Sequence, residues 1–212
     1  MPLRRVAAFV LAAAAVPAAG ACGAPSPEIA IQGAVLAEAD GVVPAAEGPT
    51  VALTGAAAGG PLPALPDADV VRVAIDRTVP YRDADRLIEA LAAAGKTPVY
   101  LVSSHRDLRG FVVARPTADV EAIRLVATDD GKACVSPPGV AEAKCVQRPD
   151  KKHIDRAFVR ELTREAHRAY HLDTVHIDAD PGVEWGDIVR AIDGARTCCA
   201  DTPITVGLRP AT

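Results

Sequence analysis

The sequence predicts an α/β protein of the α+β kind, in which a mixed β-sheet carries helices on one face. Two observations lead to this prediction. Short runs alternate between apolar and polar residues, as strands do, and two of them are followed by a segment with helical spacing and a second strand-like run. The 212 residues are 50% apolar, which is enough to bury a core, and only 3% are aromatic. We therefore expect a core built mainly from Val, Ile and Leu.

The clearest of these β-α-β units lies near the C-terminus. Its first strand, Val175–Ala179, places Val175 and Ile177 on one side and polar residues on the other. Pro181-Gly182 ends this strand, and Ile204–Leu208 forms the returning strand. Between them, apolar residues recur at the i, i+3, i+4, i+7 spacing of one buried helix face: Ile188, Ala191, Ile192 and Ala195.

A related unit lies earlier, in residues 70–102. Aligned without gaps, the two units share a strand, an acidic residue after it and an aromatic residue at the helix start: Val71 with Val175, Asp76 with Asp180, and Tyr81 with Trp185. The helix faces match too, with Ala84, Leu87, Ile88 and Leu91 in the earlier copy. This correspondence indicates two related β-α-β units, a duplicated or quasi-symmetric module. Whether they share one sheet is left open by the pattern.

The elements between the two units are shorter. A strand at Ile123–Ala127 and a strand at Ala133–Val135 are joined by the turn Asp129-Asp130-Gly131. Residues 136–152 contain several prolines and predict a loop. A helix is expected from Asp155 to about Tyr170, with an apolar stripe formed by Phe158, Leu162 and Ala166.

The N-terminus has the composition of an export signal. Arg4-Arg5 precedes the apolar run Val6–Val16, and Ala19-Gly20-Ala21 is a small-residue cleavage site. We therefore predict a signal peptide at residues 1–21. Cys22 directly after it resembles the lipid-accepting cysteine of bacterial lipoproteins, so lipidation of Cys22 is expected, with cleavage before an ordinary cysteine as the alternative.

The composition of the chain divides the exported part into three segments. Residues 22–66 are rich in Ala, Gly and Pro and predict a flexible tether, with a short strand at Val51–Leu53. Residues 67–115 contain the first β-α-β unit, and residues 116–212 form the C-terminal domain.

The C-terminal domain resembles the periplasmic domain of the ExbD/TolR biopolymer-transport proteins. The motif that carries the resemblance follows the apolar strand of the second unit: Asp180, Val183, Trp185 and Asp187. The likeness covers residues 120–208, because the strand, hairpin and helix expected before this motif come in the order that such a domain has. Residues 70–102 are a partial echo of it.

The resemblance implies a protein on the periplasmic side of a bacterial membrane, active in biopolymer transport or envelope maintenance. Members of the family join energised inner-membrane motors through an N-terminal spanning helix with an acidic residue. Here Val6–Ala21 contains no Asp or Glu, so we do not expect the motor function. What remains is binding, to an envelope protein partner or to peptidoglycan, with self-association as a homodimer, no enzymatic activity and no cofactor. The net charge of −4 argues against nucleic acid as a partner.

Four cysteines besides Cys22 fit an oxidising compartment: Cys134, Cys145, Cys198 and Cys199. Cys134 and Cys145 would close a short loop, which would leave the neighbours Cys198 and Cys199 to pair with each other. Two bridges from the hairpin region to the end of the last helix are the alternative.

A row of arginines recurs every four residues along the helix expected at 155–170: Arg156, Arg160, Arg164 and Arg168. One interpretation is a contact surface for an anionic polymer such as peptidoglycan. The other is a solvated helix face, balanced by Glu161 and Glu165 through i, i+3 pairs to Arg164 and Arg168.

Two further functions are kept as alternatives. If Val6–Ala21 is retained as a membrane anchor, the chain is a divergent transport subunit. An exported metal- or ligand-binding enzyme is the other alternative, because His176, Asp178 and Asp180 alternate on one strand and share a face. The same alternation is typical of a half-exposed strand, so we expect no metal.

Overall fold

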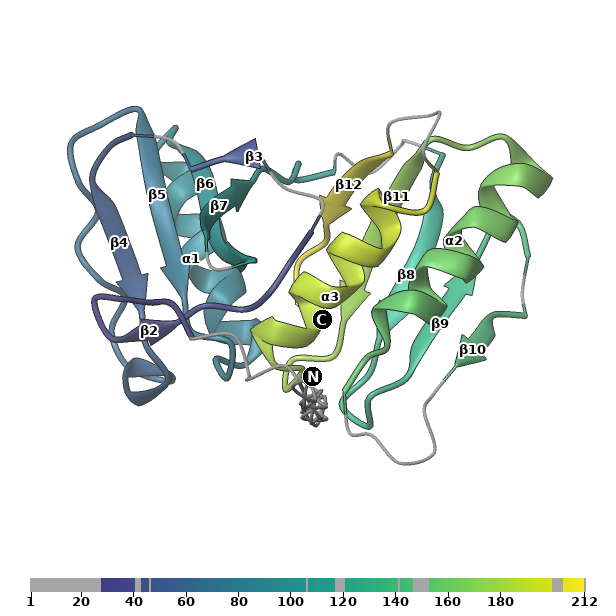
Figure 1. Ribbon diagram of the computed structural model, residues 1–212, viewed down its shortest axis with the longest axis horizontal. Coiled ribbons are helices and arrows are strands. Elements are labelled where there is room, and N and C mark those ends of the chain that lie inside the picture. The colour runs from purple at the N-terminus through teal and green to yellow at the C-terminus, as the bar shows by residue number, and fades with distance from the viewer. Residues whose placement is uncertain are drawn as a thin grey trace, which may run out of the picture.

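A computed structural model describes residues 28–40, 43–45, 47–105, 107–116, 121–140, 142–146, 153–199 and 204–211 (Figure 1). The predicted signal peptide and Cys22 lie outside these residues. The α+β class is confirmed, with mixed sheets and helices packed on them, and the described strands form two five-stranded sheets and one two-stranded sheet, β1-β2. Among the described residues, no helix is long and apolar enough to span a bilayer.

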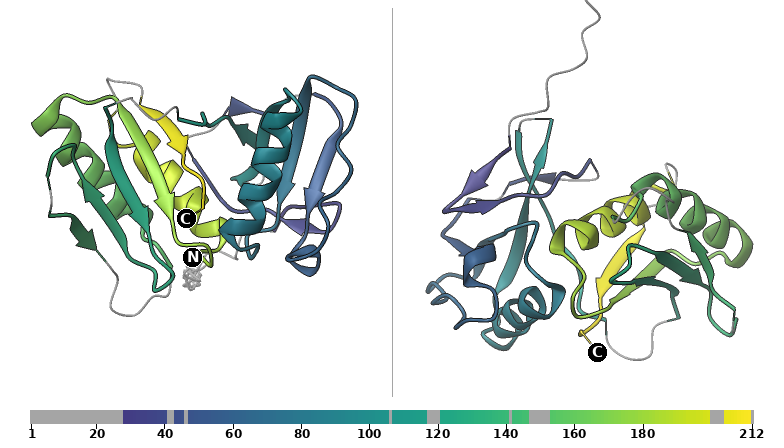
Figure 2. Two further views of the ribbon diagram at one scale, coloured as in Figure 1. Left: turned by 180° about the vertical axis from the view of Figure 1, so that it is seen from behind. Right: turned by 90° about the horizontal axis from the view of Figure 1, so that it is seen from below.

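The first sheet contains the earlier β-α-β unit and has the order β3-β7-β6-β5-β4. Strands β4, β5 and β6 are parallel, and β7 and β3 continue the sheet antiparallel. Helix α1 lies on one of its faces (Figure 2). The elements are β3 (Val43–Pro44), β4 (Thr50–Leu53), β5 (Val70–Ile75), α1 (Tyr81–Ala93), β6 (Thr97–Ser104) and β7 (Asp107–Phe111).

The second sheet contains the later unit and has the order β10-β9-β8-β11-β12. Strands β8, β11 and β12 are parallel, and β9 and β10 are antiparallel. Helices α2 and α3 lie side by side on one face of this sheet (Figures 1 and 2). The elements are β8 (Ile123–Ala127), β9 (Ala133–Ser136), β10 (Lys144–Val146), α2 (Arg156–Tyr170), β11 (Thr174–Ala179), α3 (Trp185–Arg196) and β12 (Thr205–Leu208).

The two β-α-β units meet at the starts of their helices, around a local two-fold axis. The amide of Tyr81 donates to the carbonyl of Val183 (2.7 Å), and the amide of Trp185 donates to the carbonyl of Val79 (2.8 Å). Tyr81 aligns with Trp185 in the sequence, and Val79 with Val183, so each bond is the symmetry counterpart of the other. The quasi-symmetry expected from the sequence is therefore present in the contacts between the units.

A single hydrophobic core runs across this junction, although the sheets are separate. The ring of Trp185, 1% exposed, lies 5.7 Å from that of Tyr100 and 6.4 Å from that of Phe111, centroid to centroid. Tyr100 and Phe111 belong to the first sheet, and Trp185 begins the last helix. A backbone link adds to this contact, because Ala114, after β7, bridges to Gly207 of β12. The two units thus share one hydrophobic core.

The strand predicted at Val51–Leu53 is confirmed as β4, but the rest of the predicted tether at residues 22–66 is wrong for the residues that the structure describes. Residues 28–66 contain β1 (Ala30–Ile31), β2 (Ala34–Val35), β3, β4 and the 3₁₀-helix η1 (Gly55–Ala57). The reason lies in the first sheet, whose strand β6 buries Val99 to Val102 on both faces. Helix α1 covers one face, and Leu36 packs against Leu101 in the cluster on the other. A strand that is apolar on both faces must be covered on both sides. The N-terminal segment at residues 28–66, which we call the N-terminal layer, covers the second face.

Asp76, at the end of β5, connects the N-terminal layer to this strand by hydrogen bonds. Its carboxylate accepts bonds from the amide of Val35 (2.9 Å) and from the amide and hydroxyl of Thr78 (2.9 and 2.7 Å). Burial raises the pKa of the Asp76 carboxyl, but these hydrogen bonds and the charge of Arg77 outweigh it, and the net shift is downward.

We expect Asp76→Asn to cost about 1 to 2 kcal/mol of unfolding free energy at neutral pH, because bonds to a charged acceptor are lost. A carboxyl with a depressed pKa stabilises the fold above its unfolded pKa, and this contribution disappears as the pH falls through the folded value. In urea unfolding, the difference between wild type and variant should therefore shrink as the pH falls below about 4, the ordinary pKa of an aspartate carboxyl. A difference that is constant with pH would contradict this role.

Candidate functional site

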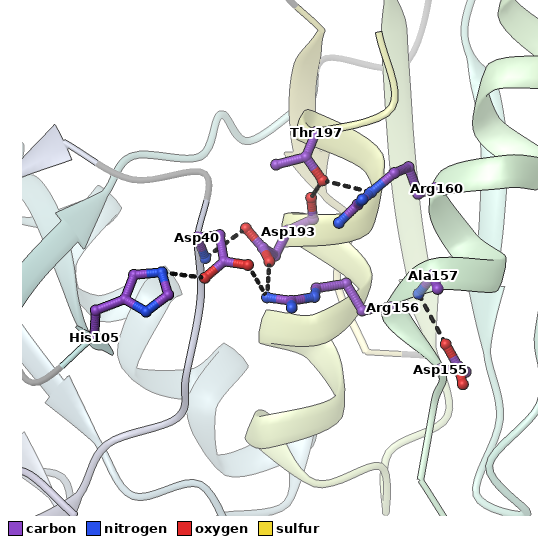
Figure 3. Close-up of polar contacts among 8 residues, drawn as sticks. All are labelled: Asp40, His105, Asp155, Arg156, Ala157, Arg160, Asp193 and Thr197. Carbon is purple, nitrogen blue, oxygen red and sulfur yellow. Dashed lines mark hydrogen bonds and ion pairs between the residues drawn. The ribbon is translucent and has the colours of Figure 1, made fainter. Parts of the chain in front are cut away.

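The arginine at the start of α2 lies between two acidic residues rather than in solvent (Figure 3). Arg156 Nη1 is 2.8 Å from Asp193 of α3 and 2.6 Å from Asp40 of the N-terminal layer. The amide of Asp40 donates to Asp193 Oδ1 (3.0 Å), and His105 Nε2 is 3.6 Å from Asp40. Burial lowers the pKa of the Arg156 guanidinium, but the two carboxylates outweigh it and raise that pKa. This network joins α2, α3 and the N-terminal layer.

The next two arginines of the row also face α3. Arg160 Nε donates to the hydroxyl of Thr197 (3.2 Å), and Arg164 Nε donates to the carbonyl of Cys198 (2.9 Å). Arg168, one turn further, is exposed. Three of the four arginines thus stabilise the packing of α2 on α3. Two of them, Arg160 and Arg164, lie at the C-terminal end of α3, which is where cations are favourable. The row as a whole does not present an open surface to a polymer.

The acidic partners expected for these arginines are partly different. Glu161 pairs with Arg164 across one turn (2.7 Å), as the spacing predicts. Glu165 instead reaches Lys144 of β10 (2.5 Å).

The buried face of α2 is also rotated from the predicted stripe. Ala166 is buried as predicted, but Phe158 is 43% exposed and Leu162 is only partly buried. The other buried positions are Val159 and Thr163. Three of the arginines at every fourth position contact α3 or its C-terminal end, and the neighbouring stripe with Val159 and Thr163 is the buried one.

All four residues of the ExbD/TolR-like motif lie at junctions of the fold: Asp180, Val183, Trp185 and Asp187. Asp180 accepts a bond from the amide of Asp129 in the β8–β9 turn (3.1 Å). Asp187 accepts from the amide of Ile154, just before α2 (3.2 Å). Val183 and Trp185 make the two-fold contacts described above. The motif therefore positions elements rather than forming a site by itself.

The metal site considered at His176, Asp178 and Asp180 is not assembled. The carboxylate of Asp178 pairs with Arg124, and its other oxygen is 3.5 Å from Arg209. Asp180 points to the neighbouring turn, and no cluster of metal-ligating residues occurs among the residues that the structure describes. The arginines were not anticipated, although strand register could have suggested one: Arg124 is the direct neighbour of His176 across β8 and β11.

A polar cavity of about 320 Å³ opens on the side of the second sheet opposite α2 and α3, and it is the candidate functional site. This helix-free face is visible from behind the molecule (Figure 2). The residues that matter for its chemistry are Glu121, Arg124, Ser136, Pro137, His176 and Arg209. Its volume lies at the lower end of the range of small-molecule sites.

His176 lies between the sheet and the cavity. Burial lowers the pKa of its imidazole and the charge of Arg209 lowers it further, against an opposing effect of Asp178. The ring is therefore neutral at neutral pH and can offer one donor and one acceptor. Gly207 lies beneath it, since a Cβ there would be 3.3 Å from His176 Cδ2 and 3.1 Å from Pro116 Cδ.

Two disulfides are present, and they follow the first of the two pairings considered. Cys134 and Cys145 are direct partners across β9 and β10, with Cα atoms 3.9 Å apart. The neighbours Cys198 and Cys199 are bonded to each other after α3. The first disulfide closes the loop that contains Ser136 and Pro137, so it fixes one wall of the cavity.

We expect the double variant C134S/C145S to lose about 2 kcal/mol of unfolding free energy, because a closed loop restricts the unfolded chain. The matched variant C198S/C199S should lose clearly less, since a bond between neighbours restricts almost no chain. Chemical unfolding of both variants under non-reducing conditions measures the difference. Equal losses would contradict the loop explanation.

No protein-family model, curated protein or solved structure matches this chain. The resemblance to the ExbD/TolR family therefore stays a prediction, carried by the motif and by the order of elements around it. The site is described by its own chemistry: a cavity on an open sheet face, with paired arginines over a buried carboxylate.

Proposed function

We propose that this chain is an exported, lipid-anchored binding module of ExbD/TolR-like design, which contacts an envelope protein or the cell wall. Its work is biopolymer transport or envelope maintenance, on the periplasmic side of a bacterial membrane. Cys22 is the anchoring residue, and no motor helix takes part. The module acts by binding and not by catalysis.

The order of elements supports the proposal. The strand, hairpin and helix that the resemblance places before the motif correspond to β8, β9 and α2, and they are followed by β11, α3 and β12. Two disulfides fit an oxidising compartment.

One observation carries the binding function: the helix-free face of the second sheet. Where the first sheet has apolar residues on both faces and is covered on both, this sheet turns Arg124, Ser136 and His176 outward around a cavity. A small number of precisely placed polar groups in a concave surface gives a binding site its specificity.

The test is photo-crosslinking in the native envelope. The full-length protein carries a photoreactive residue at Ser136 on the open face or, as the matched control, at Phe158 on the helix-covered side. We expect a product with one envelope protein or with the peptidoglycan sacculus at Ser136, several-fold above the yield at Phe158. Equal yields at both positions, or none at either, would overturn the proposal.

The two alternatives predict other results. A divergent transport subunit that keeps Val6–Ala21 would copurify with an inner-membrane motor protein. A metal-dependent enzyme would retain a metal after purification, although the pairing of Asp178 with Arg124 and Arg209 favours an organic ligand at this face.

A further inference from the structure

We propose that the cavity on the helix-free face binds a small ligand through a single carboxylate group, and that Arg124 and Arg209 both hydrogen-bond to this group. This inference deepens the proposed function, because it names the chemistry of the group that the binding module recognises. It also assigns a role to Asp178, as the residue that positions the two arginines.

The orientation of the two guanidiniums is the first argument. Both use Nε toward Asp178: Arg124 Nε binds Oδ2, and Arg209 Nε is 3.5 Å from Oδ1. Within the part of the chain that the structure describes, their terminal nitrogens have no other hydrogen-bonding partner. One carboxylate thus holds two guanidiniums side by side with their outer donors pointing away from it. Such donors match the oxygens of a carboxylate in number and geometry.

Both arginines are also fixed at their main chains. Arg124 is a central residue of β8, between β9 and β11. Arg209 donates its amide to the carbonyl of Ile177 (2.9 Å), and its own carbonyl accepts from the hydroxyl of Tyr81 (2.5 Å). Burial raises the pKa of Tyr81, so its hydroxyl stays protonated and remains a donor. A receptor fixed in this way loses little conformational freedom when the ligand binds.

The remaining lining completes a site for a small group. Neutral His176 and the hydroxyl of Ser136 provide donors that carry no charge. Gly207 allows His176 and Pro116 to approach the sheet closely. The wall at Pro137 belongs to the loop closed by the Cys134–Cys145 disulfide.

The charges around the cavity select the ligand class. Arg124 and Arg209 are balanced in formal charge by Asp178 and by Glu121, which also lines the cavity. Because these four residues carry no net formal charge, the charge of a bound anion is not neutralised by the site, and the cost of removing the anion from water rises with its charge. We therefore expect a monocarboxylate, such as the free end of a short peptide, rather than a phosphate.

Isothermal titration calorimetry on the purified mature protein tests this inference. The probes are N-acetyl-alanyl-alanine, its C-terminal amide and inorganic phosphate. We expect heat of binding for the carboxylate, at least about tenfold weaker binding for the amide, since a charged hydrogen bond is lost, and weaker binding for phosphate. Equal binding of carboxylate and amide, or no binding of the carboxylate, would overturn the inference.

Variants locate the binding. Arg124→Gln and Arg209→Gln should each weaken binding of the carboxylate probe about tenfold or more, and each leaves Asp178 one arginine partner, so the fold is retained. The matched control is Arg168→Gln, which changes an exposed arginine of α2 on the other side of the sheet. The NMR signals of the His176 ring should shift on titration in wild type and in Arg168→Gln. Equal weakening by all three variants would contradict the assignment to this cavity.

Failure of this inference differs from failure of the proposed function. If Ser136 crosslinks in the envelope but no probe binds, the carboxylate assignment is wrong and the binding module stands. If the carboxylate probe binds but no crosslink forms, the contact with the envelope is wrong and the cavity assignment stands.

Discussion

Trp185→Ala is expected to destabilise the protein by about 4 kcal/mol, the largest effect of any single substitution considered. Its ring is fully buried at the junction of the two units, against Tyr100 and Phe111. Removal leaves a large cavity between elements that other contacts keep apart, so the surrounding residues cannot collapse into it. Equilibrium unfolding in guanidinium chloride, followed by circular dichroism, measures the loss.

The control is Phe158→Ala, at a ring that is 43% exposed on α2, and it should cost less than about 1 kcal/mol. Because one core joins the units, the Trp185 variant should still unfold in a single transition, at lower denaturant. Two separate transitions, with only one displaced, would mean that the units are independent domains and would contradict the shared core.

Asp193→Ala is expected to cost about 3 kcal/mol. The carboxylate of Asp193 is buried and accepts from Arg156 and from the amide of Asp40. The substitution removes one of the two carboxylates that pair with Arg156 and leaves the amide of Asp40 without its acceptor, and both effects are costly. The loss should be accompanied by faster amide hydrogen exchange in residues 34–40, because this network joins the N-terminal layer to α3.

An exposed ion pair serves as the comparison for Asp193. Asp107 lies 3.2 Å from Arg109 with 66% of its side chain exposed, so Asp107→Ala should cost well under 1 kcal/mol. Unfolding by urea at neutral pH measures both variants. If the two substitutions cost the same, the network at Asp193 does not contribute to joining the layers.

The sequence predicted the elements whose apolar pattern is strong. The strand at residues 123–127 has the bounds expected, and both β-α-β units are present because apolar spacing and turn residues agree there. Apart from the strand predicted at Val51–Leu53, which is β4, the N-terminal layer was missed, since its other strands are two residues long and Ala- and Pro-rich composition resembles that of a tether. Its order comes from pairing with β5 and β7, which is tertiary information.

The prediction of the site was also limited because contacts between residues far apart in the sequence are not visible in the sequence pattern. The strand alternation identified His176 and Asp178 as neighbours on one face, and the structure agrees. It could not identify Arg209, which lies beyond the last strand and reaches Asp178 only because β12 is parallel to β11. The arginines of α2 were visible as a row, but their partners Asp193, Thr197 and Asp40 are distant in the sequence.

The most direct test of the central proposal, an exported and lipid-anchored binding module, is the intact mass of the protein isolated from the membrane fraction, before and after reduction. We predict a chain that begins at Cys22, carries acyl groups and gains the mass of four hydrogen atoms when both disulfides are reduced. A chain that still contains residues 1–21 and carries no lipid would contradict this proposal and would favour the divergent transport subunit instead.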